Sequence, residues 1–176
     1  MLSTLANILD WINRTIGKAF AWLLLVMVLV QFAVVLMRYV FGVGSLWAQE
    51  SIIYMHAFVF MLAAAYTLSA DGHVRVDIFY RGADPRRKAM VNLLGSIFLL
   101  IPVSVLIVVV SWTYVGSSWR IMEGSAEASG IPGVFVLKTV IPAFGIMMAV
   151  QGLVIIIRSW LALNGDRTEL ERLSHG

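Results

Sequence analysis

The sequence contains no cysteine among its 176 residues, and charged side chains make up only 13% of it. The absence of thiols excludes disulfide bonds, cysteine nucleophiles and cysteine-ligated metal sites. Soluble domains normally carry about 25% charged residues. Because 60% of this chain is hydrophobic, its polar side chains are too few to cover a soluble monomer. The composition therefore excludes ordinary soluble enzymes, disordered proteins and disulfide-rich scaffolds.

Four long segments carry no charged residue: 19–37, 51–70, 89–119 and 139–157. A helix needs roughly 20 apolar residues to cross the hydrocarbon core of a bilayer. We therefore predict an all-α integral membrane protein, a single domain over residues 1–176 with four transmembrane helices. The expected spans are 19–41, 48–70, 89–118 and 134–160. Pro102 and Pro142 fall inside the last two spans and are candidate kinks.

The basic residues predict the orientation in the membrane. Ten of the 13 Lys and Arg residues lie on the side that holds the N-terminus, the connection between the second and third spans, and the C-terminus. Cytoplasmic loops are enriched in these residues, so both termini are predicted to be cytoplasmic. The basic residues are spread over three segments without interleaved aromatic residues. This pattern indicates contacts with membrane lipids and no nucleic-acid binding.

Apolar residues recur at helical spacing in the first 18 residues, and polar residues lie off that stripe. The apolar stripe comprises Leu2, Leu5, Ile8, Leu9, Ile12 and Ile16, and the polar residues include Asp10, Asn13, Arg14 and Lys18. The pattern is typical of a short amphipathic helix at the membrane interface. It is equally compatible with a plain extension of the first span.

Few polar side chains fall within the expected spans, and none in a central part is charged. For Gln31, His56 and Gln151 we predict hydrogen bonds between helices. Asn92 opens the third span. A single His within a span does not provide the two axial ligands of a membrane haem, and no nucleotide-binding or hydrolase motif occurs. We therefore expect no catalytic residues, no metal site and no cofactor in this chain.

Two groups of charged residues stand out at the ends of the expected spans. Arg38 ends the first span and Glu50 begins the second, so we predict an ion pair between them at the outer interface. Trp47 suits an interfacial aromatic anchor. His73 and Asp77 would share a face on a helix, and also on an extended segment. Both a solvated polar face and a clamp to a neighbouring helix remain open for this second group.

Three short motifs occur in a fixed order relative to the spans. They are Arg38-Tyr39-Val40-Phe41-Gly42, Trp47-Ala48-Gln49-Glu50 and Asp71-Gly72-His73-Val74-Arg75-Val76-Asp77. In this combination the chain resembles, over essentially its whole length, the small DctQ-like membrane subunit of tripartite ATP-independent periplasmic (TRAP) transporters. One departure is Ala63-Ala64-Ala65, where family members often have Gly.

The resemblance implies a scaffold in the bacterial inner membrane. Such a subunit binds a large membrane subunit, which holds the sodium and substrate sites, and helps dock a periplasmic substrate-binding protein that delivers an organic acid. On the family pattern, structural or interface roles fall to Arg38, Trp47, Glu50, His73 and Asp77. Weaker candidates for docking the binding protein are Arg120, Glu123 and Glu127 in the outer loop.

Two other readings compete with this resemblance. The first is a self-sufficient, homo-oligomeric four-helix transporter, which needs a carboxylate within the membrane. Glu50 is the only candidate, and its place at the start of a helix argues against that role. The second is the membrane anchor of a redox complex, which would show a haem absorption band.

Overall fold

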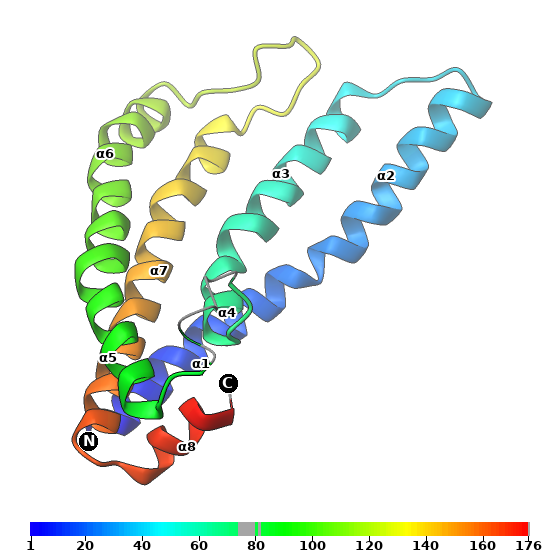
Figure 1. Cartoon of the computed structure of the whole chain (residues 1–176). Helices are drawn as coiled ribbons and strands as arrows, with labels where there is room; N and C mark the ends of the chain where they lie inside the picture. The colour runs from blue at the N-terminus through cyan, green and yellow to red at the C-terminus, as the bar shows by residue number, and fades with distance from the viewer. Residues whose placement is uncertain (74–79, 81, 176) are drawn as a thin grey trace.

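The computed structural model describes residues 1–73, 80 and 82–175, and the regular structure in these residues is entirely helical. Figure 1 shows α1 (Leu2–Ala21), α2 (Leu23–Val40), α3 (Leu46–Leu62), α4 (Ala64–Ser69), α5 (Pro85–Gly95), the π-helical turn η1 (Ser96–Leu100), α6 (Ile101–Arg120), α7 (Val134–Leu163) and α8 (Arg167–His175). Four helical stretches are long and apolar enough to cross a membrane: Leu2–Val40, Leu46–Ser69, Pro85–Arg120 and Val134–Leu163. The prediction of an all-α protein with four such helices is confirmed.

The local sequence explains where the helices begin and where their hydrogen-bonding pattern changes. Ser45 precedes α3, and its hydroxyl accepts a hydrogen bond from the backbone N–H of Ala48 at 3.3 Å, as an N-cap residue does. Asp84 caps α5 in the same way, with Pro85 at the first helical position. The turn η1 ends two residues before Pro102, whose ring nitrogen has no hydrogen to donate to the preceding turn. Pro142 lies inside α7, which continues through it.

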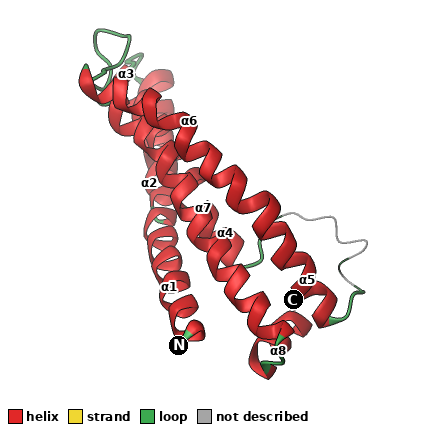
Figure 2. Cartoon of the chain, turned by 90° about the vertical axis from the view of Figure 1, so that its left-hand side faces the viewer, coloured by secondary structure: helices red, strands yellow, loops and turns green. Residues whose placement is uncertain are grey.

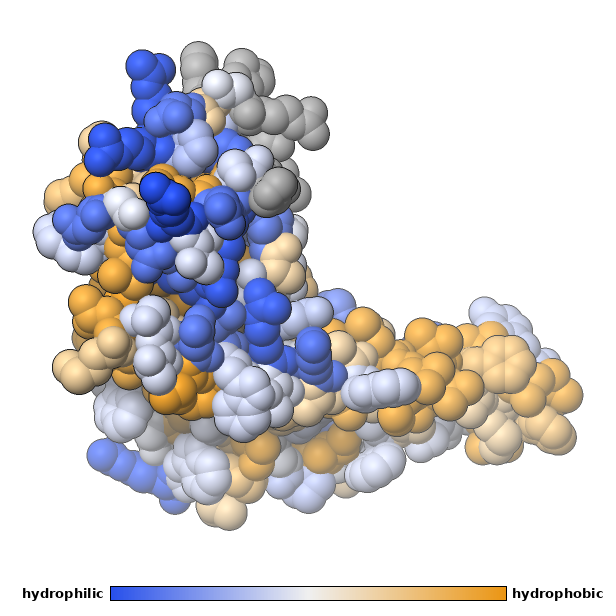
Figure 3. All heavy atoms as spheres, turned by 90° about the horizontal axis from the view of Figure 1, so that it is seen from below, coloured by the Kyte–Doolittle hydropathy of each residue, from blue (hydrophilic) through white to orange (hydrophobic). Residues whose placement is uncertain are grey.

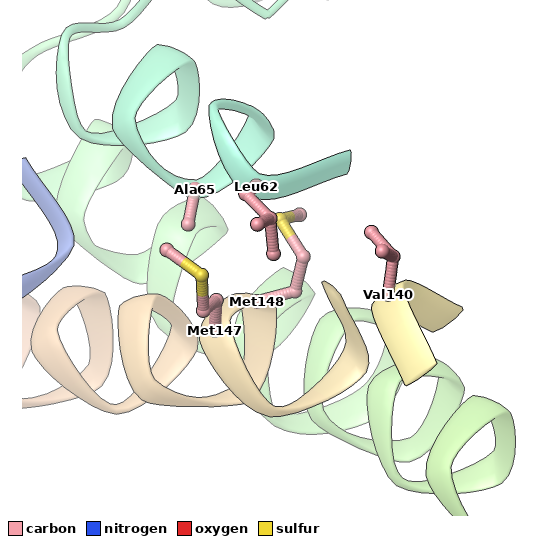
Figure 4. Close-up of a cluster of buried hydrophobic side chains, with 5 residues drawn as sticks. All are labelled: Leu62, Ala65, Val140, Met147 and Met148. Carbon is pink, nitrogen blue, oxygen red and sulfur yellow. The ribbon is translucent and has the colours of Figure 1, made fainter. Parts of the chain in front are cut away.

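Helix α7 is the centre of the bundle and contacts every other described helix except α2. Its side chains Val140, Met147 and Met148 pack against Leu62 and Ala65 of the α3–α4 stretch to form a buried apolar core (Figure 4). Seen from the side in Figure 2, α7 lies between α1 and α6.

A glycine allows α6 to approach α7 closely. A Cβ atom added at Gly145 would lie 2.8 Å from a methyl carbon of Val108 and 2.9 Å from the carbonyl oxygen of Ser104. Both distances are shorter than ordinary van der Waals contact, so a larger residue would force the two helices apart. Small residues have this role in the packing of membrane helices.

Helix α1 turns its apolar face outward. Its buried residues are Ala6, Asp10, Asn13 and Gly17, whereas Leu2, Leu5, Ile8 and Trp11 are exposed. A helix of a soluble protein has the opposite arrangement. The outward apolar face fits a lipid environment, where exposed hydrocarbon is not penalised.

Helix α2 continues from α1 after a break at Trp22 and runs away from the rest of the bundle (Figure 1). It contacts only α3 and α1 among the described residues, and none of its residues is buried. Seen from the end that carries the termini, polar side chains gather on the bundle while an apolar arm projects from it (Figure 3).

Candidate functional site

The first polar cluster joins α1 to α7 near the end of the bundle that carries both termini. We call it the Asp10 network; its members are Asp10, Asn13, Arg14, Gln151 and Arg158. The Asp10 carboxylate accepts hydrogen bonds from Gln151 Nε2 at 3.2 Å and from an Arg158 Nη at 3.0 Å. Arg14 Nε lies 3.1 Å from the same carboxylate. Asn13 Nδ2 donates to Gln151 Oε1 at 3.0 Å and to the carbonyl oxygen of Met147 at 3.2 Å.

The network satisfies side chains that water does not reach. Asn13 and Gln151 are each 1% exposed and Asp10 is 6% exposed. Buried amides and carboxylates are costly unless they are hydrogen-bonded, and here the two helices provide each other's partners. The prediction of an interhelical hydrogen bond for Gln151 is confirmed.

Sequence reasoning missed Asp10 and Asn13 because the polar side of residues 1–18 was expected to face water or lipid head groups. A signal was present. Ala6, Asp10, Asn13 and Gly17 recur at intervals of four, three and four residues, which is the spacing of a helix–helix contact seam. A stripe of small and polar residues at that spacing, in a chain poor in polar residues, indicates a face that packs on protein.

The second polar cluster lies at the opposite end and holds the outer loop, residues 121–133, against α3 and α7. Glu50 accepts a hydrogen bond from the Ser125 hydroxyl at 2.5 Å and another from the backbone N–H of Ile131 at 2.6 Å. Gly130 packs so closely on Ser125 and Glu50 that an added Cβ atom would lie 2.7 Å from Glu50 Oε1. Both carboxylate oxygens of Glu50 are therefore engaged by the loop.

A second anchor of the loop is the ion pair between Glu123 and Lys138, whose Nζ lies 2.5 Å from Glu123 Oε2. The hydrogen bond from Lys138 lowers the pKa of Glu123 below its ordinary value of 4.5. Lys138 Nζ also lies 4.1 Å from the ring centroid of Tyr114, a cation–π contact. Beside it, Trp119 Nε1 donates to Thr139 Oγ1 at 2.8 Å. The ion pair fixes the loop to α7, and the other two contacts join the ends of α6 and α7.

The predicted ion pair between Arg38 and Glu50 is wrong for this structure. Arg38 is exposed at the end of α2, and no ion pair joins it to Glu50 among the described residues. The physical reason is that α2 projects from the bundle, whereas Glu50 is bound by Ser125 and Ile131 of the outer loop. Glu50 thus meets a partner about 80 residues further along the chain and not the neighbouring helix end.

The remaining candidates are scattered. Trp47 and Arg120 are exposed at the end that carries the outer loop, and Glu127 is exposed within that loop. His73 is exposed after α4, while Asp77 lies outside the described residues, so their shared face stays a prediction. Within the part of the chain that the structure describes, no group of His, Asp and Glu side chains is arranged to hold a metal ion.

The other two residues predicted to bridge helices do not do so. Gln31 and His56 are both exposed, and neither has a hydrogen-bond partner among residues 1–73, 80 and 82–175. His56 instead stacks on Phe60, with ring centroids 6.1 Å apart. Gln31 is the only residue with an amide side chain in α2, and it lies near the middle of that helix.

Comparison with known proteins agrees with this architecture. Residues 27–162 match the family described as tripartite ATP-independent periplasmic transporters, DctQ component. The C4-dicarboxylate TRAP transporter small permease protein DctQ of Vibrio cholerae serotype O1 is 32% identical over 88 residues, which cover 50% of this chain and 38% of that relative. The match thus spans well under half of the relative's length, and no solved structure matches the chain. The family match covers the helices from α2 to α7 almost completely, and the chain belongs to the DctQ component family of TRAP transporters.

Proposed function

We propose that this chain is the fixed scaffold subunit of a TRAP transporter that imports an organic acid with sodium. It would bind a large membrane subunit, which holds the sodium and substrate sites, and would help dock a periplasmic substrate-binding protein. The name of the Vibrio cholerae relative specifies C4-dicarboxylates; for this chain we propose the broader class of organic acids. No catalytic step and no cofactor is assigned to the chain itself.

The observation that carries the proposal is the isolation of α2. The helix has no buried residue and contacts only α3 and α1 among the described residues. Gln31 lies near its middle, exposed and without a described hydrogen-bond partner. An unpaired amide facing hydrocarbon is costly, whereas polar residues of membrane helices commonly bond to neighbouring helices. A large membrane subunit packed on this face of α2 would give Gln31 a partner.

The outer cluster supports the docking role. Glu50 and the Glu123–Lys138 pair hold the outer loop in one arrangement, and a rigid surface loses less entropy when a partner binds. The loop lies at the end of the bundle opposite the two termini (Figure 1). If the termini are cytoplasmic, as the distribution of Lys and Arg predicts, this loop faces the periplasm.

Cross-linking tests the partner directly, because the chain has no cysteine of its own. Val28 and Val35 flank Gln31 on one face of α2, and both are exposed. Val28→Cys or Val35→Cys, labelled in native membranes with a maleimide that carries a photoreactive benzophenone and then irradiated, should give an adduct with a much larger membrane protein. Val110→Cys on the exposed face of α6 is the matched control and should give none.

The same experiment distinguishes the scaffold role from the alternative function, a homo-oligomeric transporter. Adducts of twice the mass of this chain from Val28→Cys, with no larger partner, would contradict the scaffold and favour the homo-oligomeric transporter. That alternative also needs Glu50 to bind and release protons or substrate, although both of its oxygens are hydrogen-bonded to the outer loop.

Orientation is tested with the same cysteine-free background. Ser174→Cys in α8 and Glu127→Cys in the outer loop both replace exposed residues. A membrane-impermeant maleimide applied to cells with a permeabilised outer membrane should label Glu127→Cys only. Labelling of Ser174→Cys alone would show that the predicted orientation is inverted.

A further inference from the structure

The residue that follows the end of α6 has an unusual backbone conformation. Met122 has a φ of 47°, in the left-handed region that residues with a bulky side chain rarely adopt. The backbone N–H of Glu123 donates to the carbonyl oxygen of Ser118 at 3.0 Å, and that of Met122 donates to the carbonyl oxygen of Trp119 at 3.2 Å. This pair of hydrogen bonds is the Schellman motif that closes many helices, and its left-handed residue is usually glycine.

Two other helices of the chain are followed by the expected residue. Gly42 has a φ of 67° after α2, and Gly165 has a φ of 93° after α7. At Met122 a long apolar side chain therefore occupies a position where glycine would relieve the backbone. Backbone strain of this kind is concentrated at functional sites, so the conformation of Met122 is a reason to look for what its side chain contacts.

The Met122 side chain contributes little to the packing of this chain. Met122 is 60% exposed, and its neighbour Ile121 is 72% exposed. Neither belongs to the buried apolar core around Val140 and Met148 in the described part of the chain. The strained turn therefore holds an apolar side chain on the surface. We call these two residues the Ile121–Met122 patch.

The Ile121–Met122 patch lies beyond the hydrocarbon of the membrane. The helical stretch Pro85–Arg120 has 36 residues, about 54 Å at 1.5 Å per residue, whereas the hydrocarbon core is roughly 30 Å thick. Trp112 of α6 is exposed, and tryptophans of membrane helices are enriched at the level of the head groups. Arg120 lies about 12 Å further along the helix. The patch therefore faces water, where exposed apolar side chains are costly.

The position of the patch indicates which partner covers it. Helix α6 lies at the opposite edge of the bundle from α2 (Figure 1) and does not contact it, and α2 is the helix on which we place the large membrane subunit. The patch begins the outer loop, which Glu50 and the Glu123–Lys138 pair hold in one arrangement. Arg120 precedes the patch and is exposed, as polar residues at the rim of a protein interface are. This surface fits a soluble protein that approaches from the periplasm.

We propose that the periplasmic substrate-binding protein packs against this chain at the Ile121–Met122 patch, through an apolar surface of its own. The left-handed conformation of Met122 brings an unbranched, adaptable side chain to the centre of the contact. Arg120 borders the contact and acts mainly on the rate of association. The proposal rests on the docking role proposed above and assigns that role to two apolar residues.

Photo-crosslinking identifies the partner in cells with a permeabilised outer membrane. Met122→Cys is labelled with a maleimide that carries a benzophenone, since the chain has no cysteine of its own, and is then irradiated. We expect an adduct with a soluble protein that mass spectrometry identifies as a periplasmic substrate-binding protein. Val43→Cys is the matched control and should give no such adduct, because Val43 is exposed between α2 and α3, at the other edge of the bundle.

Substitutions separate binding from folding. Met122→Gly removes the side chain and suits the left-handed backbone, so the melting temperature should not fall. The affinity for the captured binding protein, titrated against the complex of this chain and its large partner in nanodiscs, should fall about tenfold. Ile121→Ser should also weaken this binding, whereas Val43→Ser, which replaces an apolar residue of similar exposure, should leave it unchanged.

Three results would overturn the proposal. A lower melting temperature of Met122→Gly with unchanged affinity would show that Met122 only supports the fold. An adduct of Met122→Cys with the large membrane subunit would make the patch part of the interface between the membrane subunits. Adducts with lipid alone would place the patch in the bilayer.

The scaffold role is tested separately by the cysteine in α2. Capture of the large subunit by Val28→Cys, without capture of a binding protein by Met122→Cys, would contradict the docking patch and leave the scaffold role intact. Failure of both cysteines to capture their partners would contradict the proposed function as well.

Discussion

Replacing Asp10 should destabilise the protein more than replacing any exposed acidic residue. Asp10 is 6% exposed, and its carboxylate binds groups of Gln151, Arg158 and Arg14 at 3.0–3.2 Å. Asp10→Ala removes all three interactions at once. It also leaves Arg158, whose Nε already lacks a partner, without its ion pair.

The size of the effect follows from burial. Breaking a fully buried ion pair by removing one partner costs about 3–5 kcal/mol. The Arg158 and Arg14 side chains are 22% and 42% exposed, so solvent partly compensates the arginines that remain. We therefore expect Asp10→Ala to lower the free energy of unfolding by about 2–3 kcal/mol. Asp10→Asn retains an acceptor oxygen and should cost about 1 kcal/mol.

The assay is the unfolding of the purified protein in mild detergent, followed by circular dichroism, with Glu171→Ala as the control. Glu171 is exposed on α8 at the same end of the bundle, and its loss should change stability by less than about 0.5 kcal/mol. Arg158→Met combined with Asp10→Ala should be less destabilising than the sum of the single changes, because neither charge is then left alone. A cost of Asp10→Ala no larger than that of Glu171→Ala, or strict additivity of the double variant, would refute the reasoning.

Three further outcomes follow from the packing of the outer loop and of α7. Gly130→Ala would place a Cβ atom 2.7 Å from Glu50 Oε1, so hydrogen exchange of residues 121–133 should accelerate, whereas Glu127→Ala in the same loop should leave it unchanged. The pKa of Glu123 is lowered by Lys138, so its contribution to stability is present above pH 4.5 and is lost as the pH falls through the lowered pKa. The melting temperature should therefore fall between pH 7 and the acid range, and it should fall less in Lys138→Met; an identical dependence of the melting temperature on pH in the two proteins would contradict this. Gly145→Leu should cost about 1–3 kcal/mol by overpacking because its side chain meets Val108 and Ser104, whereas Gly116→Leu, in open space, should be tolerated; equal melting temperatures would sink the argument.

The number and character of the helices could be predicted because hydropathy is a local property of the chain. The unbroken apolar run before Arg158 is enough to predict a helix there, and α7 contains it. The pairing of side chains could not be predicted in the same way. Glu50 was expected to bind Arg38, 12 residues away, yet its partners are Ser125 and Ile131, which only the arrangement of α3, α6 and α7 brings close.

The orientation of the first helix shows a different limit of sequence reasoning. Periodicity identifies two faces of α1 but does not say which face meets protein. In water the apolar face would be buried, whereas in a membrane lipid covers apolar side chains as well as protein does. The face with Asp10 and Asn13 is therefore the one that gains most from packing on Gln151 of α7. In such a helix, polar and small residues mark the buried seam.

The distribution of polar groups along α7 bears on the proposed scaffold role. Near one end of the helix, Lys138 holds Glu123 of the outer loop and Thr139 accepts a hydrogen bond from Trp119 of α6. Nearer the other end, Gln151 and Arg158 hold α1. Between them, Val140, Met147 and Met148 pack on Leu62 and Ala65 in an apolar core. An ion or an organic acid that crossed the membrane within this chain would have to pass this core without a polar partner, which is costly. The hydrogen bonds at both ends of α7 and the close packing between them instead suit a helix bundle that keeps its shape while another subunit moves.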